Sequence, residues 1–363
     1  MKMHVPAKIS KIIGVSGWKG KYAQLRRKYR KFSALFRSKS YASPDELFFS
    51  VEDLPPLGKE YWFLHFSAPP EKSQVILTLG RSAEAVRVNS SPLEGVMEKG
   101  GKGSIRCAAV GWLYSGSKRV LMDSHADVTI QKGRKESALE AKGRDSRVEV
   151  RGTYPNFDVS FSKGGTEIFA AKAFAPKSGL PYEMLYILDN PLVPKLSTVL
   201  VNYYFDFKGA LYGKPITGKA YLQKVIAVMP LAPWNWVRIN FASGAVIDFF
   251  TGKPFGDKSE VRFAGNAYFE HEGRRVKLDG RLLLSSCMDG ESRIWLLTGK
   301  NLFLSMRTYS LQPFVMKQRT VFRYDEYLVK VTDFAYREGG NEHSLTTLGG
   351  GTGIVEEASG YLL

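Results

Sequence analysis

Four residues that could bind or act on an organic ligand recur at every second position of one short segment. The segment PWNWVRINF contains them in the order Trp234, Trp236, Arg238 and Asn240. Side chains alternate between the two faces of a β-strand, so these four share one face, and Val237, Ile239 and Phe241 share the other. The apolar face is typical of a protein core. The face with two indoles, a guanidinium and an amide fits the wall of a cavity that holds an apolar ligand and binds its few polar groups.

The same pattern is also compatible with a purely structural role. Indoles can close one end of a barrel or pack between two domains, and Arg238 could stack over one of them. Because β-barrels use aromatic residues for both purposes, the spacing leaves the cavity and the packing alternatives open.

A β-rich body must position this strand. From Leu47 onward, short runs of β-branched and aromatic residues alternate with turn residues, as in KEYWFLHFSA, SQVILTLGR and TVLVNYYFDFKG. Strands at this spacing predict an all-β fold built from antiparallel barrels or sandwiches. A chain of 363 residues is long enough for two domains. We expect a boundary near residues 205–217, which gives an arm at 1–45 and two β-domains at 46–213 and 214–363.

Four motifs carry a resemblance to a known family. GKAYLQKV spans 218–225, PWNWVRINFASG spans 233–244, EYWFLHFSAP spans 60–69, and GGGTGIVEEASGYLL spans 349–363. They resemble motifs of the carotenoid 1,2-hydratase (hydroxyneurosporene synthase) family and its lipocalin-like relatives. The resemblance implies two packed, lipocalin-like β-domains that handle long isoprenoid or other lipid substrates. The expected ligand-binding residues are then Tyr221, Gln223, Trp234, Trp236, Arg238 and Asn240.

The segment GKAYLQKV departs from the family pattern. Family members that hydrate an alkene need an acid to protonate the double bond, aromatic faces to stabilise the carbocation, and a base for the attacking water. Where the family strand carries aspartate, this chain has Gln223, and a neutral amide cannot act as a general acid in this way. The catalytic candidates that could replace it are Asp248, Glu270, His271 and His65.

Each of these candidates has a structural alternative. Asp248 fits a solvent-facing strand position, EHEGRR around Glu270 fits an exposed hairpin tip, and His65 fits a histidine of the core. Two functions therefore stay open. The first is binding of a lipid-like or isoprenoid ligand in a β-barrel cavity, peripheral to the membrane. The alternative is an enzyme that modifies an isoprenoid or lipid, of the hydratase, isomerase or cyclase type, whose acid is not the family carboxylate.

Most of the excess positive charge lies in an N-terminal arm. The chain has a net charge of +17, and 12 of its 52 Lys and Arg residues fall in residues 1–43, which contain no Asp or Glu. The arm also has apolar residues at helical spacing: Trp18, Tyr22, Leu25, Tyr29, Phe32 and Phe36. Such a face beside basic residues is typical of a helix that lies in a membrane interface. The expected membrane-contacting residues are Trp18, Tyr22, Arg26, Arg27, Lys28, Arg30 and Lys31.

The basic arm could instead pack on the body or bind nucleic acid, and the rest of the chain predicts no cofactor. A helix can bury its aromatic face on the body, and a basic helix also attracts nucleic acid, which is the less favoured partner.

Cys107 and Cys287 lie far apart and the five histidines form no ligand cluster, so we expect no metal site. No segment has the roughly 18–20 apolar residues of a membrane-spanning helix, and no signal-peptide segment is present. We expect a cytoplasmic protein that associates peripherally with membranes.

We expect the full-length protein to float with anionic liposomes, and a version without residues 1–43 to stay in the soluble fraction. Each basic residue near an anionic surface contributes about 1 kcal/mol of attraction. Flotation in a density gradient measures the difference, with uncharged liposomes as the control. Equal flotation of both versions, or flotation of neither, would contradict the membrane hypothesis.

Overall fold

The computed structural model describes residues 41–89, 91–93, 104–133, 135–176, 181–187, 197–253, 267–278 and 281–362. Within these ranges the chain forms two antiparallel sheets and two short helices, α2 (Pro44–Phe48) and α3 (Leu345–Leu348). This confirms the all-β fold. Among the described residues, no helix combines the length and the hydropathy needed to cross a bilayer. The predicted basic helix and its membrane-contacting residues lie outside the described ranges, so membrane association stays a prediction.

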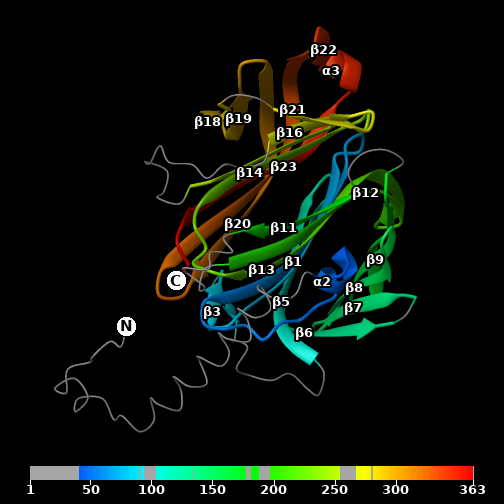
Figure 1. The fold of residues 1–363 in the computed structure, drawn as a ribbon, viewed down its shortest axis with the longest axis vertical. Coiled ribbons are helices and arrows are strands. Elements are labelled where there is room, and N and C mark those ends of the chain that lie inside the picture. Colours follow the sequence, from blue (N-terminus) through cyan, green and yellow to red (C-terminus); the bar gives the residue numbers. More distant parts are fainter. Residues whose placement is uncertain are drawn as a thin grey trace, which may run out of the picture.

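The first sheet closes into a barrel of ten described strands (Figure 1). Its strands are β1 (Gly58–Ala68), β2 (Ser73–Ser82), β5 (Ser104–Tyr114), β6 (Lys118–Lys132), β7 (Ser137–Lys142), β8 (Ser146–Thr153), β9 (Asn156–Lys163), β10 (Thr166–Phe174), β12 (Ser197–Leu211) and β13 (Lys214–Val228). They follow the order β10-β9-β8-β7-β6-β5-β2-β1-β13-β12, and β10 pairs with β12 to close the ring. The strand β11 (Tyr182–Ile187) pairs with the other end of β12.

Inward-facing side chains fill this barrel. On β1 every second residue points inward, and Trp62, Leu64 and Phe66 are at most 1% exposed. The helix α2 adds Leu47 and Phe48 to the same core. The Trp62 indole donates a hydrogen bond of 2.8 Å to the Phe48 carbonyl, which fixes the helix against the barrel. The interior of the first barrel is therefore a packed core.

The second sheet comes mainly from the C-terminal half of the chain. Its strands are β3 (Val86–Val88), β4 (Ser91–Leu93), β14 (Trp234–Phe241), β15 (Val246–Gly252), β16 (Ala267–His271), β17 (Arg274–Lys277), β18 (Leu283–Asp289), β19 (Ser292–Thr298), β20 (Leu302–Lys317), β21 (Val321–Glu338), β22 (Asn341–Ser344) and β23 (Gly351–Gly360). The main order is β17-β16-β15-β14-β23-β21-β20-β19-β18. Because β3 pairs with β20, a piece of the first half is built into the second sheet.

The two sheets pack face to face through one shared cluster of buried side chains. Phe63 and Tyr221 of the first sheet meet Trp236 of the second sheet in this cluster. Val237 and Ile239 point the other way, into the core of the second sheet. The two-residue alternation of β14 is therefore confirmed, and its aromatic and polar face lies between the two sheets.

The chain passes from the first sheet to the second between β13 and β14. Pro230 and Pro233 lie in this connection, and a proline cannot donate to a sheet ladder, so both strands end there. The boundary expected at 213/214 falls instead within a hairpin. Tyr212 and Gly213 both have positive φ, at 52° and 74°, and form the two-residue turn between the long paired strands β12 and β13.

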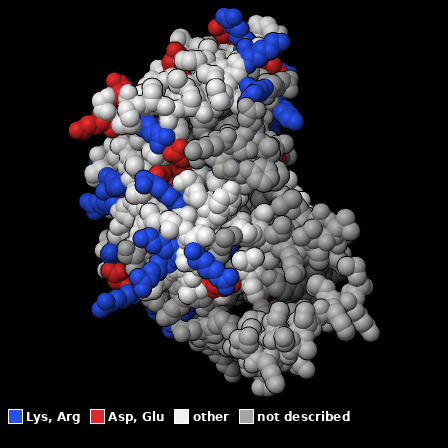
Figure 2. Space-filling model, turned by 90° about the vertical axis from the view of Figure 1, so that its left-hand side faces the viewer, with Lys and Arg blue, Asp and Glu red and all other residues white. Residues whose placement is uncertain are grey.

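Charged side chains of both signs are scattered over the face of the molecule in Figure 2. On the face in Figure 2, Lys and Arg lie at several separate places, with Asp and Glu among them. This distribution agrees with the composition, because the chain has 35 acidic residues and all of them lie beyond residue 43.

Candidate functional site

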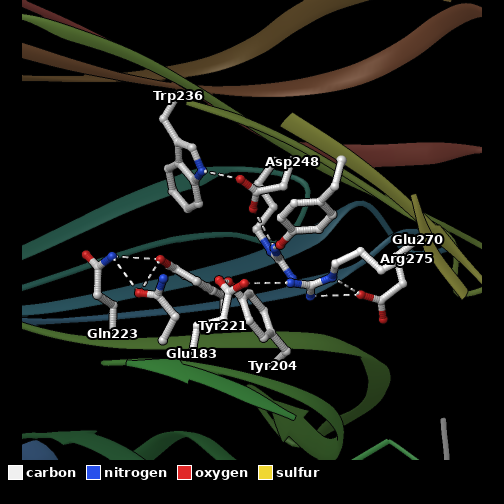
Figure 3. A network of polar contacts seen from close by, with 11 residues as sticks. Glu183, Tyr204, Tyr221, Gln223, Trp236, Asp248, Glu270 and Arg275 are labelled. Atoms are coloured by element: carbon white, nitrogen blue, oxygen red, sulfur yellow. Dashed lines mark hydrogen bonds and ion pairs between the residues drawn. The ribbon is translucent and has the colours of Figure 1, made fainter. Parts of the chain in front are cut away.

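An ion pair and an indole meet at the centre of the layer between the two sheets (Figure 3). Arg238 on β14 lies directly opposite Asp248 on β15, and its guanidinium donates to the carboxylate at 2.6 Å. The Trp236 indole donates to the other oxygen of Asp248 at 3.1 Å. Asp248 is 6% exposed, so the sequence-based alternative of a solvent-facing residue is wrong. Both carboxylate oxygens accept hydrogen bonds, which makes Asp248 an acceptor that orients Trp236 and Arg238.

Two neighbouring tyrosine rings of the first sheet lie against the guanidinium. The Arg238 carbon lies 5.1 Å from the Tyr204 ring centroid and 4.9 Å from that of Tyr221. Arg238 therefore lies between the two sheets against tyrosine rings and not over an indole. Burial, followed by the charge of nearby groups, raises the pKa of both tyrosines well above the usual value, so their hydroxyls stay protonated.

Gln223 takes part in this layer as a hydrogen-bond donor. Its amide nitrogen donates to the Tyr221 hydroxyl at 2.7 Å and to the Asn202 side-chain oxygen at 2.9 Å. Tyr221 in turn donates to the same Asn202 oxygen at 2.8 Å. The position at which the family resemblance implies an acid is thus a neutral donor that holds a tyrosine.

The structure places His65 and Asn240 in the buried part of the same layer. His65 is 1% exposed and its Nε2 lies 2.6 Å from the Gln74 side-chain oxygen. Burial lowers the pKa of His65 to about 4, so the imidazole is neutral at ordinary pH, as expected of a core histidine. The Asn240 side chain is 1% exposed, and its oxygen accepts no hydrogen bond from any described residue.

Glu270 and His271 lie on opposite faces of β16. Neighbours along a strand point to opposite faces. Glu270 accepts a hydrogen bond of 2.9 Å from Arg275, whose guanidinium lies 3.9 Å from the Tyr268 ring centroid at the rim of the layer. The His271 ring lies beside His343 instead, with 5.5 Å between ring centroids.

A pair of buried carboxyl groups, absent from the sequence-based candidates, lies in the same layer. Glu326 on β21 is directly opposite Glu356 on β23, and their exposures are 1% and 6%. Glu356 accepts one hydrogen bond from the Trp234 indole at 2.9 Å and one from the Tyr324 hydroxyl at 2.5 Å. Glu326 accepts a short hydrogen bond from the Trp112 indole, which reaches across from the first sheet.

Burial gives this pair an unusual affinity for protons. Burial, together with the charge of Glu356, raises the pKa of Glu326 from 4.5 to about 8. Burial also raises the pKa of Glu356 to about 7, although the hydrogen bonds from Tyr324 and Trp234 lower it. Two buried carboxyl groups at directly opposite positions do not both ionise easily, so the pair retains a proton near neutral pH. Perturbed acids of this kind occur preferentially at functional sites.

The sequence contains a signal for only one member of the pair. Glu356 belongs to the closing motif GGGTGIVEEASGYLL, whereas Glu326 is one of several acidic residues in the strand around RYDEYLV. On β14, Trp236 lies directly opposite Glu356, so the aromatic face and the acid pair are neighbours across three adjacent strands. That adjacency depends on strand register, which the residue pattern does not give.

Comparison with known proteins supports the fold. No protein-family model and no curated protein sequence matches this chain. The crystal structure of a candidate AttH protein from Nitrosomonas europaea covers 90% of this chain and 98% of its own, with 14% identity and a TM-score of 0.50. At this identity the likeness shows the fold alone, and it agrees with the lipocalin-like β-fold that the motifs imply.

Two further crystal structures align more distantly. CghA with Sch210972 shares 12% identity and covers 85% of this chain and 89% of its own, with a TM-score of 0.47. Kievitone hydratase from Nectria haematococca shares 8% identity and covers 83% of this chain and 89% of its own, with a TM-score of 0.43.

Replacing Glu326 by glutamine should change how stability depends on pH. A carboxyl whose pKa is raised on folding stabilises the fold fully below its unfolded pKa, and this contribution is lost as pH rises through the folded value. The free energy of unfolding of the wild type should therefore fall, relative to Glu326→Gln, between about pH 5 and about pH 9, by at least about 1 kcal/mol. Urea unfolding at several pH values measures it.

The matched control for this experiment is Glu342→Gln, because the Glu342 side chain is 57% exposed. The control should follow the wild-type profile. Parallel profiles for wild type and Glu326→Gln would show that the pair does not retain a proton near neutral pH.

Proposed function

We propose that this protein is an enzyme that protonates a carbon–carbon double bond of an isoprenoid or a similarly apolar lipid. The observation that supports it is the Glu326–Glu356 pair, whose proton is retained near neutral pH within an aromatic enclosure. A general acid works best when its pKa lies near the working pH, and the pair meets that condition. It would supply the acid that Gln223 cannot.

The surroundings of the pair suit the intermediate of such a reaction. Protonation of a trisubstituted alkene produces a tertiary carbocation, and aromatic faces attract cations. Trp112 and Trp234 are both tied to the carboxyl groups through their indole N–H, so their rings are held beside the acid. Trp234 and Tyr324 are only half-buried, which places the surface within reach of the pair.

The apolar side chains around the pair suggest the class of substrate. The inter-sheet cluster that contains Trp112 also contains apolar residues such as Phe314, Phe322 and Leu328. An apolar hydrocarbon can contact these side chains without leaving polar groups unsatisfied. If the basic arm binds membranes, it would bring the enzyme to the phase in which such substrates dissolve.

Glu326→Gln should lower the turnover of an acyclic polyprenoid by roughly 100-fold or more, because removal of a general acid typically costs that much. Squalene and geranylgeraniol in detergent micelles serve as probes, and gas chromatography with mass spectrometry measures the products. Glu357→Gln is the matched control. Glu357 follows Glu356 in the chain, but its carboxylate accepts a hydrogen bond of 2.8 Å from Arg293 and takes no part in the pair.

The control should keep wild-type turnover. Equal turnover by Glu326→Gln and the wild type would contradict the proposed acid. Binding of the probes by the wild type without any chemical change would favour a lipid carrier instead.

A further inference from the structure

The two carboxyl groups leave the sheet side by side. Glu326 and Glu356 are directly opposite each other on β21 and β23, and side chains at such positions project from the same face with about 5 Å between their Cβ atoms. A substrate that lies over the pair therefore meets both carboxyls on one of its own faces. An acid and a base that act on opposite faces of a double bond would need a different arrangement.

The hydrogen bonds distinguish the two carboxyls. Glu356 accepts from two donors, one on each oxygen: Trp234 at 2.9 Å and Tyr324 at 2.5 Å. Donors directed at both oxygens stabilise the carboxylate form. Glu326 accepts from the Trp112 indole on one oxygen and also contacts the Tyr324 hydroxyl, whose single proton is directed at Glu356. Glu326 is also the more deeply buried of the two, at 1% against 6% exposure. Glu326 is therefore the better holder of the proton and Glu356 the better base.

Apolar side chains flank the pair on both sides along β23 and on one side along β21, where Tyr324 lies on the other side. Leu328 lies two residues from Glu326 on β21. Ile354 and Ala358 each lie two residues from Glu356 on β23, and all three belong to the inter-sheet cluster. A buried water needs two to four polar partners. The polar groups beside the pair, on Trp112, Trp234 and Tyr324, already direct their hydrogens at its carboxyl oxygens. They are therefore not left for a water, and the geometry favours chemistry that uses no water.

We propose, on the basis of the proposed function, that this site moves a double bond along the substrate. The proton shift takes place on one face of the substrate, with Glu326 as the acid and Glu356 as the base. The O–H bond of Glu326 breaks, and the alkene π electrons form a C–H bond to one carbon. The other alkene carbon becomes a carbocation. Glu356 then removes a proton from the carbon next to the cation, and that C–H electron pair becomes the new double bond. The substrate keeps its elemental composition, and no co-reactant is consumed.

Tyr324 can restore the starting state. After one turnover Glu326 is a carboxylate and Glu356 carries the proton. The Tyr324 hydroxyl hydrogen-bonds to both Glu356 and Glu326. It can accept the proton from Glu356 while it donates its own to Glu326, which closes the cycle within the pair.

The test follows wild-type turnover of squalene in D₂O and in H₂O by gas chromatography with mass spectrometry. We expect an isomer of squalene, unchanged in mass in H₂O and carrying deuterium at a former alkene carbon in D₂O. Glu326→Gln and Glu356→Gln should each lower its formation by roughly 100-fold or more, and Glu357→Gln should not.

Tyr324→Phe supplies a second readout. It should lower kcat by roughly ten-fold and leave KM within about two-fold, because the hydroxyl stabilises the carboxylate form of Glu356 and returns the proton to Glu326, and both effects concern the proton transfers and not substrate binding. A merely structural contribution of Tyr324 would instead change KM or the unfolding midpoint together with kcat.

The outcomes separate the two proposals. A product heavier by one water would retain the acid but overturn the proton shift. Full isomerisation by Glu356→Gln would overturn the assignment of the base. Absence of any product from the wild type would overturn the proposed function itself.

Discussion

The site depends on keeping two carboxyl groups side by side and away from water. Like charges repel strongly where the dielectric constant is low, so the pair is stable when it carries one proton. The fold then stabilises the remaining charge with hydrogen-bond donors from both sheets: Trp112 from the barrel, and Trp234 and Tyr324 from the second sheet. The acid pair is therefore complete only when the two sheets are docked, and the inter-sheet layer has to be as well packed as a core.

The first barrel solves the problem of buried charge in a different way. Glu60 binds the Lys224 ammonium at 2.6 Å and also the Arg81 guanidinium at 2.6 Å, and all three side chains are buried. The Lys224 nitrogen lies 3.0 Å from the centroid of the Trp62 ring. Here opposite charges offset one another inside a packed core, which makes the cluster structural. At Glu326 and Glu356 the charges are alike, and the same burial produces proton affinity instead.

The local part of the site could be predicted, and the long-range part could not. Alternation along β14 depends only on backbone geometry, so the shared face of Trp236 and Arg238 follows from their spacing. Asp248 became a buried partner of Arg238 because β14 and β15 pair in one particular register. The acid pair requires the register of β21 and β23, and its Trp112 donor lies 214 residues from Glu326. No residue pattern gives a contact across that distance, because it arises from the docking of two sheets.

The neutral amide at position 223 is consistent with an acid elsewhere in the same layer. Gln223 bonds to Tyr221, whose ring lies 5.2 Å from that of Trp236, and Trp236 is directly opposite Glu356. The layer already holds the Asp248 carboxylate, which Arg238 neutralises, and its charge raises the pKa of Glu356. A further carboxylate at 223 would add negative charge to a layer of low dielectric and would oppose ionisation of Glu356. With an amide there, Glu356 can ionise while Glu326 keeps its proton, and one acid and one base are available together.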